Sequence, residues 1–167
     1  YPSIRVDADT LDLDALAHSF VGDSGEIADI VNPDKGGTES IGGSYPDSMK
    51  VVYFNHDVNL AAQPKNWGSG AGVLVVDGDL HISGRFEWAG IVICLGPVEV
   101  MDGISDGNTS ITGGGQGVHI WGTLLSKTIN FKISGHADIL WCSETVKKTG
   151  DLYEQRAPYM LYSVTEF

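Results

Sequence analysis

A glycine-rich stretch beyond the middle of the chain carries three oxygen-bearing side chains, Asp102, Asp106 and Asn108. Carboxylate and amide oxygens are the ligands that Ca²⁺ prefers in proteins. The sequence holds neither an EF-hand loop nor the glycine–aspartate repeat that binds calcium. We therefore expect no cofactor, and calcium at this loop is the metal site to test.

The histidines and hydroxyl groups lack the spacing of known catalytic motifs. The five histidines are His18, His56, His81, His119 and His136. The sequence contains no H-x-H or H-E-x-x-H motif, no G-x-S-x-G nucleophile motif and no phosphate-binding loop. His81 and His119 are expected to face outward, and they would share a metal only if they were stacked on one face. We expect a protein that is not an enzyme.

Tryptophans are the residues best suited to contact a partner, and the chain has four of them: Trp67, Trp88, Trp121 and Trp141. Aromatic rings in a row on a β face can stack on sugar rings. Large exposed apolar patches, however, mark protein interfaces more often than not. We predict an interaction surface at these tryptophans and favour protein packing over carbohydrate binding.

These side chains belong to an acidic, glycine-rich chain. Its 167 residues include 22 glycines and carry a net charge of −12. The length fits one domain, and the shortage of Lys and Arg argues against nucleic acid and anionic membranes as partners. No apolar run reaches the ~18 residues of a membrane span. The acid is concentrated before residue 60, where 11 acidic residues stand against 3 basic ones.

The chain divides into an N-terminal segment, residues 1–49, and a larger region, residues 50–167. We predict that the first is an acidic helix and loop that pack on a core built from the second. Residues 10–20 are predicted to form a short helix capped by Thr10 or Asp9. Its apolar face would consist of Leu13, Leu16, Ala17 and Phe20.

From residue 50 onward, apolar residues alternate with polar ones in short runs, which is typical of β-strands. Four sets of residues are each predicted to share one face: Val52, Phe54, Val58 and Leu60; Leu74, Val76, Leu80 and Ile82; Val92, Cys94, Val98 and Val100; and Val118, Ile120 and Leu124. The tail, residues 156–167, also alternates and is predicted to be a closing strand.

These runs repeat with a period of about 20 residues. The predicted equivalent positions are Val52, Leu74, Val92 and Val118, at spacings of 22, 18 and 26 residues. A second predicted column consists of His56, Gly78, Gly96 and Gly122. An imperfect repeat of strand and turn predicts a mainly β fold with a β-solenoid-like core, in which residues 103–117 form a glycine-rich loop insertion.

The same alignment places Cys94, Ile120 and Cys142 in one inward column on successive rungs. Neighbouring rungs are about 4.8 Å apart, so the two cysteines would lie roughly 9–10 Å apart. A disulfide requires Cα atoms within ~7 Å of each other. We therefore predict two free, buried thiols.

Residues 72–96 carry the longest motif, GVLVVDGDLHISGRFEWAGIVICLG. It resembles a pattern of PilX-type pilus-assembly proteins of the bacterial envelope, and the likeness extends over residues 50–146. This sequence departs from that family because it contains no hydrophobic pilin helix. The resemblance implies an extracellular or envelope location, pilus components or further copies as partners, and no catalytic residues. A more distant likeness to the polymerising bactofilins implies a filament.

We therefore expect a non-enzymatic, extracellular or pilus-associated structural module that assembles through its end rungs and tryptophan-bearing faces, as a filament or surface-appendage subunit. Two alternatives stay open, namely adhesion to a polysaccharide through the tryptophan face and, less favoured, polysaccharide cleavage. Assembly predicts self-association, whereas adhesion predicts that a monomer binds glycans.

Overall fold

The computed structural model describes residues 11–33, 41–61, 69–83, 86–101, 118–127, 129–132 and 137–161. The fold is mainly β, with two helices, α1 (Leu13–Val21) and α2 (Ser143–Leu161). The described strands between them are β1 (Ile30–Val31), β2 (Lys50–Phe54), β3 (Val58–Ala61), β4 (Ser69–Val76), β5 (Leu80–Ser83), β6 (Phe86–Cys94), β7 (Val98–Met101), β8 (Val118–Ser126), β9 (Ile129–Lys132) and β10 (Ala137–Leu140).

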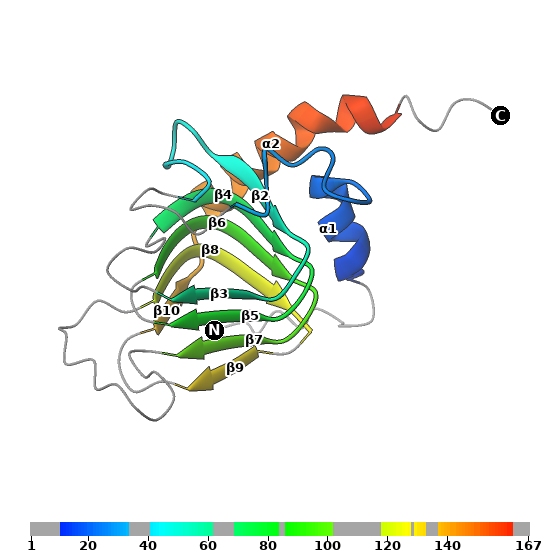
Figure 1. The fold of residues 1–167 in the computed structure, drawn as a ribbon. Helices are drawn as coiled ribbons and strands as arrows, with labels where there is room; N and C mark the ends of the chain where they lie inside the picture. Colours follow the sequence, from blue (N-terminus) through cyan, green and yellow to red (C-terminus); the bar gives the residue numbers. More distant parts are fainter. Residues whose placement is uncertain are drawn as a thin grey trace.

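The described strands form two sheets in which every pairing is parallel. The larger sheet has six strands in the order β1-β2-β4-β6-β8-β10, and the smaller has four in the order β3-β5-β7-β9. From β2 to β10 the chain changes sheet at each successive strand (Figure 1). From β4 onward, each strand pairs with the strand two before it in the sequence. Because β1 pairs with β2, the larger sheet also includes residues from the N-terminal segment.

The two sheets enclose one apolar core, built from alternate residues of their strands. Three of the four predicted face sets are confirmed, since all of their members are buried in it: Val52, Phe54, Val58, Leu60, Leu74, Val76, Leu80, Ile82, Val118, Ile120 and Leu124. Val92 and Cys94 of the remaining set lie in the same core. The structure does not describe the side chains of Val98 and Val100, so the prediction for these two residues is not tested.

The turns between the two sheets stack on one another. The Gly96 N–H donates to the Gly78 carbonyl at 3.1 Å. A Cβ atom at Gly78 would meet the backbone of His56, and one at Gly96 would meet the Gly78 carbonyl oxygen. Glycine is needed where backbones approach this closely. The predicted column of His56, Gly78 and Gly96 is thus confirmed.

The predicted equivalence of Val118 with Val92 is wrong. In the pairing of β6 with β8, Val92 lies beside Leu124, and Phe86 lies beside Val118. The predicted alignment is therefore out of register by the separation of positions 118 and 124 along the chain. Because that distance is an even number of residues, it leaves every side chain on its predicted face. Alternation alone therefore could not reveal the shift.

A second glycine column crosses the larger sheet. Gly72, Gly90 and Gly122 are neighbours in register, with φ angles of +125°, +146° and +145°. A Cβ atom at each would meet the carbonyl oxygen of its neighbour on the preceding strand, which is Lys50 for the first. Gly122 therefore lies within the sheet and not, as predicted, at a turn.

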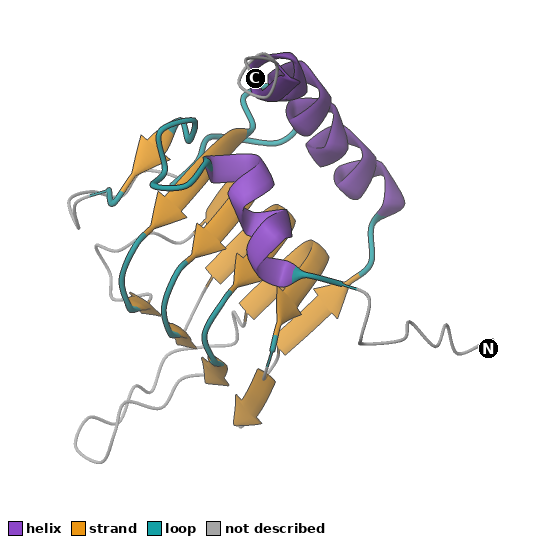
Figure 2. Cartoon of the chain, turned by 90° about the vertical axis from the view of Figure 1, so that its right-hand side faces the viewer, coloured by secondary structure: helices purple, strands orange, loops and turns teal. Residues whose placement is uncertain are grey.

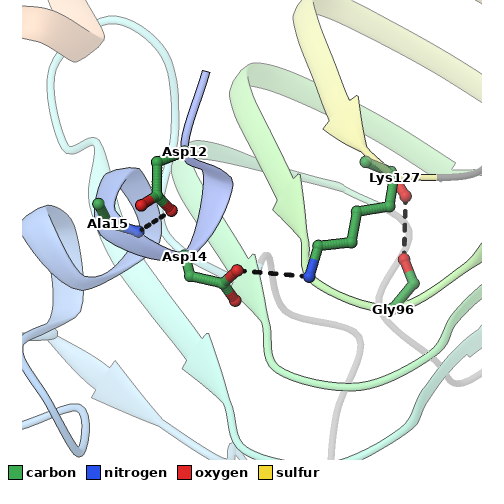
Figure 3. A network of polar contacts seen from close by, with 6 residues as sticks. Asp12, Asp14, Ala15, Gly96 and Lys127 are labelled. Carbon is green, nitrogen blue, oxygen red and sulfur yellow. Dashed lines mark hydrogen bonds and ion pairs between the residues drawn. The ribbon is translucent and has the colours of Figure 1, made fainter. Parts of the chain in front are cut away.

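The helix predicted over residues 10–20 is observed as α1 from Leu13 to Val21, and its N-cap is a later residue than either predicted cap. Asp12, and not Thr10 or Asp9, caps it, because the Asp12 Oδ1 accepts a hydrogen bond from the Ala15 N–H at 2.9 Å (Figure 3). Residues 1–10, which include the predicted caps, lie outside the described part. A side-chain oxygen at this position satisfies a backbone donor of the first helical turn.

Helix α1 covers the outer face of the larger sheet (Figure 2). Its buried residues are Ala17, Phe20 and Val21. They pack on outward residues of β2, β4 and β6 to form a second core with Val51, Tyr53, Val73, Val75 and Ile93. Leu16 is partly buried against the same cluster, so the predicted apolar face does contact the β region.

The predicted closing strand is wrong for residues 156–161, which belong to α2; residues 162–167 lie outside the described part. The helix begins far upstream, at Ser143, and Arg156 and Ala157 extend it because both have high helix propensity. Helix α2 contacts β6 and β8, and its Thr145 and Thr149 are buried. Among the described helices, none is long and apolar enough to cross a membrane.

Candidate functional site

Three large apolar side chains are exposed on or just after the last two strands of the larger sheet. Trp121 on β8 is 38% exposed, Leu140 at the end of β10 is 51% exposed, and Trp141 just beyond it is 69% exposed. Leu140 lies directly beside Trp121 in the register of the two strands. We call these three residues the terminal patch. Trp121 and Trp141 are thus surface residues, and what they bind stays a prediction.

A polar row crosses the sheet beside the terminal patch. It consists of Glu87, His119 and Asp138, which are neighbours on β6, β8 and β10. The Nδ1 atom of His119 lies 3.3 Å from Oδ2 of Asp138. The rings of His119 and Trp121 are stacked, with centroids 5.8 Å apart. The row therefore offers carboxylate and imidazole groups next to an aromatic ring.

Trp88 is not part of any surface, which corrects its predicted role. It is 0% exposed in the core between the sheets. Its ring stacks on Phe86 with centroids 6.3 Å apart, and its indole N–H donates to the Gly72 carbonyl at 3.3 Å. Trp88 has the same parity as Val92 on β6, so alternation would have placed it inside. Trp67 lies outside the described residues.

The two edges of the larger sheet differ. Within the described strands, β10 pairs only with β8, so its other side offers N–H and C=O groups to a further strand. The opposite edge is β1, which has only two residues. The chain then turns at Asn32, whose φ is +45° and whose side-chain amide donates to Asn55 Oδ1 at 2.9 Å. Pro33 follows and has no backbone N–H to donate.

Cys142 immediately precedes α2, next to the terminal patch. Its carbonyl accepts from the Val146 N–H, and its Sγ accepts from the Thr145 hydroxyl, both at 3.0 Å. Hydrogen bonds from the Thr145 hydroxyl and then from the Thr145 backbone lower the pKa of the Cys142 thiol. They do so because they favour the charged thiolate.

Cys94 has the opposite surroundings. It lies in the core, and its thiol donates to the carbonyls of Gly78 and Gly96 at 3.2 and 3.3 Å. Burial raises its pKa to about 11. Both thiols are free, as predicted. The predicted column is nevertheless wrong, because Ile139 and not Cys142 lies beside Ile120, and Cys142 is only half-buried.

The predicted metal-binding residues are not brought together. Asp102, Asp106 and Asn108 lie outside the described part of the chain. His81 and His119 lie on different sheets, in β5 and β8, so they do not stack. Among the residues that the structure describes, no three His, Cys, Asp or Glu side chains are placed to hold a metal ion.

Two residues of this site, Asp138 and Leu140, were not identified from the sequence. The sequence could have indicated them through the strand run from Ala137 to Leu140, because the second and fourth residues of a strand share a face. That face is the one that carries His119 and Trp121 on the neighbouring strand.

The chain was compared with known proteins. No protein-family model matches it, and no curated protein or solved structure does either. The function must therefore be argued from the surface itself and from the sequence motif.

Proposed function

We propose that this chain is a β-solenoid-like structural module that acts through assembly and not through catalysis. The strands alternate between two parallel sheets, and from β4 onward each pairs with the strand two before it, which supports the solenoid description. The stacked turns at His56, Gly78 and Gly96 support it as well. Such stacks bury their core between successive repeats and leave two end strands whose edges need protection.

The observation that carries the assembly function is the terminal patch beside the open edge of β10. Leu140 and Trp141 are more than half exposed, and a protein without a partner rarely leaves such side chains next to unpaired strand groups. The resemblance of residues 72–96 to PilX-type proteins favours an extracellular or envelope location. We therefore propose a subunit of a bacterial surface appendage or filament.

Sedimentation velocity of the full chain over a series of protein concentrations tests this proposal. We expect association that increases with concentration and decreases in a variant carrying both Leu140→Ala and Trp141→Ala. Negative-stain microscopy of the concentrated sample would show whether the assembled species are elongated. A chain that stays monomeric at every concentration would contradict the assembly function.

The second candidate function is carbohydrate binding, which the polar row favours. Sugar rings stack on aromatic side chains, and their hydroxyl groups bond to carboxylates and imidazoles such as those of Asp138 and His119. A glycan array with the wild-type chain and the Trp121→Ala variant tests this function. Tight glycan binding by a monomer, lost in the variant, would replace assembly with adhesion.

A further inference from the structure

We infer that two copies of this chain join tail to tail, with β10 of one copy paired antiparallel to β10 of the other. The inference rests on the proposed assembly function and deepens it, because it names the partner as a second copy and the contact as a closed, two-fold one. It is carried by the difference between the two edges of the larger sheet, by the register available at β10 and by the position of the terminal patch.

Head-to-tail stacking would require two complementary open edges, and the larger sheet does not offer them. The β10 edge has four residues, whereas the β1 edge has two and ends at Asn32 and Pro33. A very short edge strand followed by proline is a device that blocks pairing with another chain. Within the larger sheet, the β1 edge therefore provides no four-residue strand for the β10 edge to pair with, whereas the β10 edge of a second copy does.

An antiparallel pairing centred on Ile139 is compatible with the charges. In such a sheet, directly opposed residues share a face, so Asp138 would lie opposite the partner's Leu140. No two carboxylates of β10 would then oppose each other. Asp138 already lies 3.3 Å from His119 of its own chain, which reduces the cost of covering it.

The terminal patch supplies the apolar contact that a four-residue pairing lacks. Two short strands alone are marginal in water. The two-fold axis would bring both copies of Leu140 and Trp141 to one interface, where large aromatic side chains contribute most of the binding energy. Because an isologous contact uses the same surface on both copies, it closes at two and does not by itself extend into a filament.

Two glutamate substitutions at opposite edges of the larger sheet test the inference in the full chain. Leu140→Glu places a carboxylate opposite the partner's Asp138 in the proposed register, where like charges repel. Val31→Glu adds the same charge at the β1 edge, at a residue that is almost equally exposed, 45% against 51%. By sedimentation equilibrium we expect wild-type dimers, a dimer dissociation constant raised about thirtyfold or more by Leu140→Glu, and one unchanged within about twofold by Val31→Glu. Circular dichroism verifies that both variants are folded.

Cross-linking gives a readout that does not depend on a charged variant being folded. In a Cys142→Ser background, a mixture of Asp138→Cys and Leu140→Cys chains should form a mixed disulfide on mild oxidation, because these residues are directly opposed in the proposed register. Val31→Cys chains should not form a covalent dimer. A mixed disulfide between Val31→Cys and Leu140→Cys chains, or equal weakening by both glutamates, would overturn the tail-to-tail contact and leave assembly standing. A wild-type chain that never associates would overturn both.

Discussion

Lys127 Nζ lies 3.3 Å from the Asp14 Oδ2 atom, although 113 positions separate the two residues (Figure 3). The ion pair joins the start of α1 to the end of β8. Ser126, the residue before Lys127, donates its hydroxyl hydrogen to the Gly96 carbonyl at 2.9 Å. The acidic N-terminal helix thus begins beside β8, which lies late in the sequence. The acidic residues that are concentrated before residue 60 therefore do not all lie at the β1 end of the larger sheet.

We predict that this ion pair contributes little to stability. Both side chains are more than half exposed, so Lys127→Met should change the free energy of unfolding by less than about 1 kcal/mol. Phe20→Ala, which empties the buried face of the same helix, should cost about 3–5 kcal/mol. Urea unfolding followed by circular dichroism measures both. A loss of several kcal/mol in Lys127→Met would contradict this account of how α1 is held.

The glycine column of the larger sheet predicts an unequal pair of alanine substitutions. Gly90→Ala should destabilise the fold by more than about 2 kcal/mol, because the new Cβ would meet the Gly72 carbonyl oxygen and φ is +146°. Gly150→Ala in α2 should instead stabilise by about 0.5–1 kcal/mol, since nothing lies within 4 Å of its Cβ position. Thermal unfolding compares the two, and a tolerated Gly90→Ala would show that the strands can separate there.

The tryptophans should separate into one structural and two surface residues. Trp88→Ala should cost about 3–5 kcal/mol, because it removes a fully buried ring and the hydrogen bond to Gly72. Trp141→Ala should change the unfolding free energy of the monomer by no more than about 0.5 kcal/mol. Chemical denaturation below the association concentration isolates the monomer. Equal losses in the two variants would mean that Trp141 packs against the fold.

The two thiols should differ in reactivity with pH. The thiolate is the nucleophile, and the lowered pKa of Cys142 means that its alkylation rate should level off at a lower pH than that of an ordinary thiol. Thr145→Val removes the hydroxyl donor and should raise the pKa of Cys142, so its alkylation rate should level off at a higher pH. Cys94, buried and with its pKa raised to about 11, should stay unmodified in the folded chain.

Mass spectrometry of alkylated peptides between about pH 6 and pH 10 measures both sites at once. Unfolding in urea, which exposes Cys94, is the positive control for its modification. If Cys94 reacted as fast as Cys142 in the folded chain, or if Thr145→Val left the profile of Cys142 unchanged, the assigned surroundings of these thiols would be wrong.

Alternation along the chain by itself determined which side chains face the core. Val52, Leu74 and Val118 lie inside as predicted, because successive residues of a strand point to opposite faces whatever the strand pairs with. The turn column of His56, Gly78 and Gly96 followed from the same local spacing. Local caps were less certain, since several acidic residues compete for the start of α1 and only Asp12 meets the Ala15 N–H.

Only the tertiary structure decided which residues become neighbours. Val118 lies beside Phe86 and not Val92, because a shift by an even number of residues keeps every face and changes every partner. Residues 156–161 alternate like a strand but continue the helix begun at Ser143, and the high helix propensity of Arg156 and Ala157 opposes the local pattern. The terminal patch likewise exists only because β10 is placed beside β8, which brings Leu140 next to Trp121.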